Sequence, residues 1–147
     1  MFCLSLVVGV LCLVAGCGCG KSGGEKVYIQ LENAENLGSL QMTLSYDDSI
    51  IEIIDIKAEK LSKNAMLEFN KDTPGRLVIG IIDSAGINGS GPVAVINFKI
   101  LQEDGDSPFN IVEAQAYKAD TLVDIPASII NGSFSKDNAS DPTLSFK

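Results

Sequence analysis

One stretch of alternating residues restricts this chain to β structure more than any other feature. Between residues 39 and 46 apolar and small polar side chains alternate strictly, a period typical of a strand with one buried and one exposed face. The apolar members are Leu40, Met42, Leu44 and Tyr46. The run ends at Asp47-Asp48-Ser49, whose short polar side chains favour a turn. An isoleucine-rich run over residues 50–56 follows, so the pattern predicts a strand, an acidic turn and a second strand.

The rest of the chain repeats this arrangement of short strands between turn residues. Further strands are expected at residues 27–32, 76–83, 94–100, 109–117, 122–130 and 133–135. Polar connections are expected at residues 33–38, 84–91 and 102–108, and residues 57–69 read as an irregular crossing with one short helical turn. Many short strands separated by Gly, Asn and Asp predict an all-β sandwich.

The segment Arg76–Asp83 differs from the other expected strands because its apolar residues do not alternate with polar ones. An antiparallel strand normally exposes one face, so apolar residues on both faces predict that both faces are covered. The second cover could be a loop of the same chain or another protein. Gly80, in the middle of this strand, indicates either a bulge or the close approach of another backbone.

Composition excludes several functions. The formal net charge is −8, with Lys+Arg 11 against Asp+Glu 19, which disfavours nucleic acid as a partner. The chain has no His, the usual general base at neutral pH and the commonest metal ligand. It also has no Trp, which weakens a sugar-stacking function. The four Cys all lie in the first nineteen residues, so neither a disulfide nor a zinc site is expected in the folded part.

The N-terminal residues have the character of an export signal. Residues 2–16 form an apolar run that fits a signal h-region better than a membrane span. Leu13-Val14-Ala15-Gly16-Cys17 resembles a bacterial lipobox, although no Lys or Arg precedes the apolar run. The resemblance implies cleavage before Cys17 and a lipid on its sulfur. An uncleaved N-terminal anchor is the alternative, and both predict an extracytoplasmic domain tethered to the membrane.

These observations divide the chain into four parts. We expect a lipoprotein signal peptide over residues 1–16, a flexible spacer over 17–25, a β-sandwich over 26–135 and a loose polar tail over 136–147.

Carboxylate pairs are the remaining candidates for chemistry. They occur at Asp47/Asp48, at Glu103/Asp104/Asp106 and at Asp120/Asp124. A glycosidase would need two carboxyl groups converging on a cleft, whereas each of these pairs falls in an expected turn. Calcium at Asp104 and Asp106 is a weaker interpretation than a solvated turn, because the spaced loop of a dedicated site is missing. We therefore expect no enzyme activity, no cofactor and no bound metal.

Several motifs, taken in order, resemble the cohesin domain of cellulosome scaffolds. They are NLGSLQMTLSYDDSIIEIIDI, then GRLVIGIIDSAGINGSGPVAVINFKI, then SPFNI and a closing NGSF, spanning residues 33–134. The resemblance implies a nine-stranded antiparallel jelly-roll sandwich, similar in fold to some carbohydrate-binding modules. It also implies a non-catalytic domain, one face of which binds the helices of a dockerin module on another protein.

The resemblance also implies where the partner binds. It places the dockerin-facing surface on the sheet that holds residues 39–46 and 76–83. Outward residues on the first strand are Ser39, Gln41 and Thr43, and family members carry Asn and Asp at the positions of Ser39 and Gln41. On the second strand, matching the family pattern leaves Leu77, Ile79 and Ile81 outward.

The sequence thus predicts a lipid-anchored docking module for a dockerin-bearing protein, linked to polysaccharide degradation. Two alternatives stay open. One is a carbohydrate-binding module on the same fold, which would need a surface row of aromatic side chains. The other is a structural surface lipoprotein that self-associates through the same face.

Overall fold

The computed structural model describes residues 24–135 and 138–147, and most of these residues belong to nine strands. The elements are β1 (Glu25–Ser45), β2 (Ile51–Ala58), the 3-10 helix η1 (Lys60–Ser62), β3 (Met66–Asn70), β4 (Arg76–Ile100), β5 (Ser107–Lys118), β6 (Ala127–Ile130), β7 (Gly132–Ser135), β8 (Asn138–Ser140) and β9 (Thr143–Phe146). The expected all-β sandwich with nine strands is confirmed. All strand pairs are antiparallel except that of β1 with β9.

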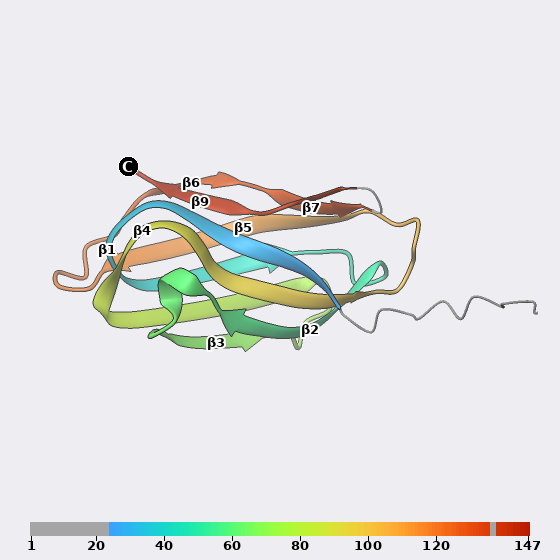
Figure 1. Ribbon diagram of the computed structural model, residues 1–147, viewed down its shortest axis with the longest axis horizontal. Helices are drawn as coiled ribbons and strands as arrows, with labels where there is room; N and C mark the ends of the chain where they lie inside the picture. The colour runs from blue at the N-terminus through green and yellow to red at the C-terminus, as the bar shows by residue number, and fades with distance from the viewer. Residues whose placement is uncertain (1–23, 136–137) are drawn as a thin grey trace, which may run out of the picture.

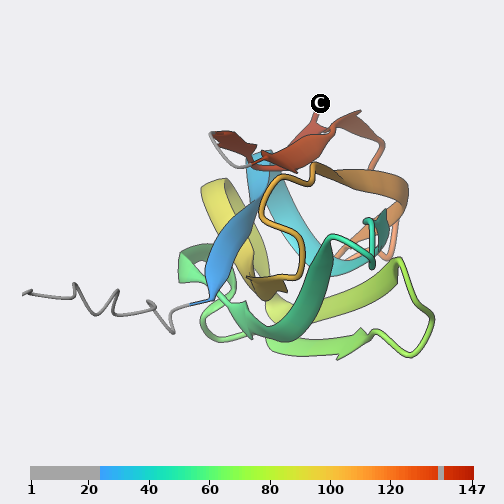
Figure 2. The same cartoon turned by 90° about the vertical axis from the view of Figure 1, so that its right-hand side faces the viewer.

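The two layers of the sandwich share β1 and β4, which are long enough to run through both. One layer has the order β3, first part of β4, second part of β1, β5. The other has the order β2, second part of β4, first part of β1, β9, β6. The pair β7 and β8 continues from the start of β5. β6 and β9 therefore lie on the opposite side of the molecule from β3 (Figure 1), and the strands surround a common interior (Figure 2).

β1 and β4 change layers together, at the segments that the sequence predicts as loops. Residues 33–38 and 84–91 are paired with each other through several register shifts. Side chains replace the missing ladder bonds: the amide of Asn33 donates to Ser90 Oγ at 2.9 Å, and the amide of Asn36 donates to Asn88 Oδ1 at 2.8 Å. Gly86, with φ 80°, allows the sharp bend there. The predicted loops are thus the irregular middle of two continuous strands.

The core lies between the layers and is built from alternate residues of each strand. β1 contributes Val27, Ile29 and Leu31 from one layer and Leu40, Met42 and Leu44 from the other, all at most 1% exposed. At one end three aromatic rings join the layers: Phe98 lies 5.4 Å from Phe109 and 5.1 Å from Phe134, between ring centroids. The buried face predicted for residues 39–46 is confirmed for its first three apolar members, whereas Tyr46 is half-buried.

The prediction of a loose C-terminal tail is wrong. β9 pairs with β1, residue by residue from Gln30/Thr143 to Glu32/Ser145, and with β6 on its other side. Leu144 is fully buried and Phe146 is 3% exposed. The tail looks polar because β9 alternates, so only two of its side chains enter the core. The folded domain therefore extends to residue 146.

Two other segments differ from the expectation in detail. The crossing at residues 57–69 has the expected short helical turn, η1, but its second half forms the edge strand β3. The expected strand at 122–130 is regular only over β6, which pairs with β9. Asn131-Gly132 consequently connects strands of different sheets, and Gly132 is required because a Cβ there would lie 2.6 Å from Pro142 N.

Candidate functional site

The outer face of the layer β3–β4–β1–β5 presents three rows of side chains, each crossing all four strands in register. The first row is Met66, Ile82, Ser39 and Tyr117. The second row is Glu68, Gly80, Gln41 and Gln115. The third row is Asn70, Val78, Thr43 and Glu113. We call these twelve residues the outer face.

Three of the four side chains in the first row are apolar and exposed, and the half-buried Ser39 lies between Ile82 and Tyr117. The exposed fractions are 64% for Met66, 58% for Ile82 and 36% for Tyr117. Single apolar side chains scattered over a surface are usual, whereas three exposed ones aligned in one row point to an interaction surface. The row is therefore the strongest candidate contact on this layer.

The other two rows are mainly polar and carry negative charge. Glu68 and Glu113 are exposed carboxylates, and Gln115 Nε2 donates to Glu113 Oε1 at 3.3 Å. No Lys or Arg occurs among the twelve residues of the outer face; Arg76 follows beyond the third row. An apolar row beside polar rows corresponds to the usual core and rim of a protein interface.

The outward placement of Leu77, Ile79 and Ile81 is wrong. Leu77 and Ile79 are 0% exposed and Ile81 is 1% exposed, and all three belong to the core. The register decides this: Ile79 pairs with Met42, and Ile81 with Leu40, which both point inward. The outward residues of this part of β4 are Val78, Gly80 and Ile82.

The placement of Ser39, Gln41 and Thr43 on the outer face agrees with the register, but the three differ in exposure. Gln41 is exposed and Ser39 is half-buried. Thr43 is 3% exposed because its short side chain lies between the cross-strand neighbours Val78 and Glu113. Their role in binding stays a prediction.

The prediction that both faces of the strand at residues 76–83 are covered holds within the domain for one face only. The core covers one side of this strand, and no loop of the described chain covers Ile82 on the other. The charged residues at the two ends of this strand give no consistent signal for its parity, because Arg76 shares a face with Ile82 whereas Asp83 shares the opposite one. For Met66 and Tyr117 the sequence held no signal either.

Asp47, the first of the paired carboxylates, acts as a turn residue. Its Oδ1 accepts hydrogen bonds from the Ser49 hydroxyl at 2.6 Å and from the Ser49 amide at 2.9 Å. These bonds, the hydroxyl first, hold the pKa of the Asp47 carboxyl below its ordinary value. A general acid needs the opposite shift, so this carboxyl suits a turn rather than catalysis.

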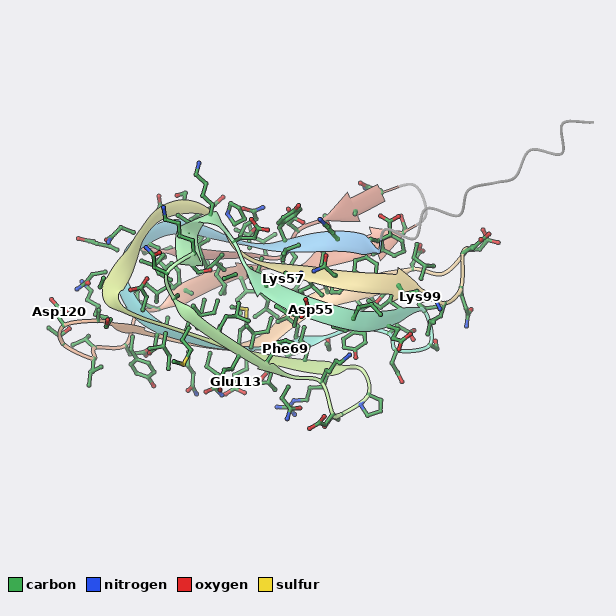
Figure 3. The ribbon with its side chains drawn as sticks, turned by 60° about the horizontal axis from the view of Figure 1, so that its bottom comes forward. Asp55, Lys57, Phe69, Lys99, Glu113 and Asp120 are labelled. Atoms are coloured by element: carbon green, nitrogen blue, oxygen red, sulfur yellow. The ribbon has the colours of Figure 1, made fainter. Side chains whose placement is uncertain are left out.

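The acidic residues and the N-terminal signal were the other candidates from the sequence. Within residues 24–135 and 138–147, no cluster of three or more His, Cys, Asp or Glu residues could hold a metal ion. Asp120 lies at one end of the domain and Lys99 toward the other, whereas Glu113 lies on β5 between them (Figure 3).

Cys17, the predicted lipidation site, falls outside the described residues, as do the predicted signal peptide and most of the spacer. Among the described residues, no helix is both long and apolar enough to cross a membrane.

Comparisons with known proteins agree with this architecture. The family model of the cohesin domain matches residues 24–135, and the chain therefore belongs to the cohesin domain family. A comparison with curated proteins finds no match.

Solved structures show the same fold at low sequence identity. A non-cellulosomal cohesin from the archaeon Archaeoglobus fulgidus is 19% identical, with a TM-score of 0.63 over 84% of this chain and 92% of that one. The sixth cohesin of scaffoldin B from Acetivibrio cellulolyticus, in complex with a Cel5 dockerin, is 18% identical, with a TM-score of 0.59 over 74% and 96%. A type I cohesin–dockerin complex from Clostridium thermocellum is 14% identical, with a TM-score of 0.60 over 83% and 96%.

Proposed function

We propose that this cohesin domain binds a dockerin module of another protein through its outer face. The observation that carries the proposal is the row across four strands in register in which Met66, Ile82 and Tyr117 are apolar and exposed. Two of the similar solved structures are cohesins in complex with dockerins, which supports a partner of this class. The domain would act as a docking module without catalysis of its own.

We further propose where this docking takes place. The lipobox-like sequence ending at Cys17 supports a lipid anchor that holds the domain outside the cytoplasm at the membrane. A dockerin-bearing partner bound there would be a protein that acts on polysaccharide. Metabolic labelling with a fatty-acid analogue tests the anchor, because Cys17→Ser should abolish the label; equal labelling of both chains would exclude lipidation at this residue.

Binding can be tested with the purified domain and the dockerin-bearing proteins of the same genome. We expect one of them to be retained in a pull-down, and Ile82→Asp to abolish retention because the new carboxylate would be desolvated only in the complex. Ile82 is 58% exposed, so this variant should keep the melting temperature of the wild type. A domain that retains none of these proteins would refute the proposal.

The same preparation separates the two alternatives. A carbohydrate-binding module would be retained by insoluble polysaccharide, although the described residues include only two exposed aromatic side chains, Phe69 and Tyr117. These two lie on different edges of the layer, on β3 and β5, rather than in a row. Self-association through the outer face would appear as a concentration-dependent shift in size-exclusion chromatography, which Ile82→Asp should remove.

A further inference from the structure

Gly80 occupies the second row of the outer face, where the other three positions carry long side chains. Across the strands it faces Glu68 of β3 on one side and Gln41 of β1 on the other. Along β4 its neighbours on the same face are Val78 and Ile82. A glycine at this place therefore leaves a gap in the surface, bordered by apolar side chains in one direction and polar ones in the other.

Among the described residues, nothing requires glycine at this position. The register of β4 with β1 is regular from residue 76 to 82, so Gly80 marks no bulge, and its φ is not positive. A Cβ added to Gly80 would have no heavy atom within 4 Å. By contrast, a Cβ on Gly38 would lie 2.7 Å from the amide nitrogen of Ala119. Since glycine weakens a strand, an unneeded one in the middle of β4 suggests that the open space has a use.

We infer that the gap at Gly80 receives one long side chain of the partner helix, and that this side chain is a Lys or Arg. This inference rests on the proposed function. The methylene stem of such a side chain would pack against Val78 and Ile82, and its charged end would reach the carboxylate of Glu68. Long cationic side chains regularly bury their stem in this way while the charge stays at a polar edge.

Charge supports a cationic group over a purely apolar one. Same-face neighbours on paired strands have Cβ atoms about 5 Å apart, which brings Glu68 to the border of the gap. Glu113 adds a second carboxylate in the third row, and the twelve residues of the outer face include no basic side chain to neutralise either. An apolar residue alone would leave Glu68 facing the partner without a counter-charge.

Filling the gap tests the inference directly. Gly80→Leu should weaken binding of the dockerin retained in the pull-down by about tenfold or more, because the partner side chain loses its space. Its melting temperature should equal or exceed that of the wild type, since a Cβ at this position has no heavy atom within 4 Å and glycine weakens a strand. Ala58→Leu is the control and should keep the wild-type affinity, because the exposed Ala58 lies on β2 in the other layer. Equal affinity of Gly80→Leu and the wild type would overturn the inference.

The charge of the occupant is tested separately. Glu68→Gln should weaken binding by about three- to tenfold and reduce its dependence on salt. Glu52→Gln, an exposed carboxylate on β2, should change neither. If Gly80→Leu loses affinity and Glu68→Gln does not, the gap receives an uncharged side chain and the assignment of Lys or Arg is wrong. If the wild-type domain binds no dockerin, the proposed function itself fails. If the wild type binds and the variants bind with the same affinity, only the inference about the gap fails.

Discussion

Ile79 and Ile82, three residues apart on β4, should respond in opposite ways to truncation. Ile79 is fully buried between the layers, whereas Ile82 is 58% exposed on the outer face. Ile79→Ala removes three carbons from the core, worth about 2.4 kcal/mol at about 0.8 kcal/mol per buried methylene. The cavity left behind brings the expected loss of unfolding free energy to about 2–5 kcal/mol. Ile82→Ala should change the unfolding free energy by no more than about 0.5 kcal/mol.

Two measurements on the same preparations separate these effects. Thermal denaturation followed by circular dichroism should show a melting temperature lowered by roughly 10 °C for Ile79→Ala and almost unchanged for Ile82→Ala. Titration calorimetry with the dockerin should show the reverse order, with Ile82→Ala weaker by about tenfold, or about 1.4 kcal/mol. Folded Ile79→Ala should keep the wild-type affinity when measured well below its melting temperature.

One result would refute this reasoning. If Ile79→Asp folded with the melting temperature of the wild type while Ile82→Ala lost several degrees, β4 would have the opposite parity. The outer face would then be Leu77, Ile79 and Ile81, as the family pattern first implied.

Three further perturbations test other parts of the structure. Leu144→Ala in β9 should cost about 2–5 kcal/mol in urea denaturation, because the side chain is fully buried; a loss below that of an exposed control such as Val112→Ala would show the C-terminal strand to be loose. Gly132→Ala should lower the unfolding free energy by about 1–3 kcal/mol, since its Cβ would lie 2.6 Å from Pro142 N, whereas Gly80→Ala should not. Because the folded-state pKa of Asp47 is lowered, its stabilisation is present above the ordinary pKa and is lost as pH falls through the folded pKa. The melting temperature of Asp47→Ala should therefore lie below that of the wild type at neutral pH, and the difference should shrink below about pH 4. A constant difference across that range would contradict the assignment.

The acidic turn and the first part of the outer face show how much local pattern can predict. Strict alternation over residues 39–46 was enough to assign Leu40, Met42 and Leu44 to the core and Ser39, Gln41 and Thr43 to the opposite side. The role of Asp47 as a turn residue could be predicted from its side-chain chemistry alone. These predictions succeed because a period of two, with a polar residue at every second position, states which face meets water.

The candidate contacts on the neighbouring strands could not be predicted in this way. Met66 lies on β3, a strand that the sequence did not predict because residues 57–69 lack the alternation of a strand. Tyr117 joins the face because it pairs with Ser39, which lies far away in the sequence. Such a row exists only when four separate strands meet in one register, and no single segment encodes that register.

The amino-acid sequence by itself determined the all-β class, the acidic turn and the two faces of residues 39–46, because alternating polarity is a local property. Only the tertiary structure decided the parity of β4 and the fate of the C-terminal residues. In Arg76–Asp83 apolar residues on both sides conceal the period, so the pairing of Ile79 with Met42 had to choose the buried face. In β9 the side chains of Leu144 and Phe146 are buried because this strand pairs with β1, at the other end of the chain. That choice of register leaves Ile82 and the gap at Gly80 on the surface.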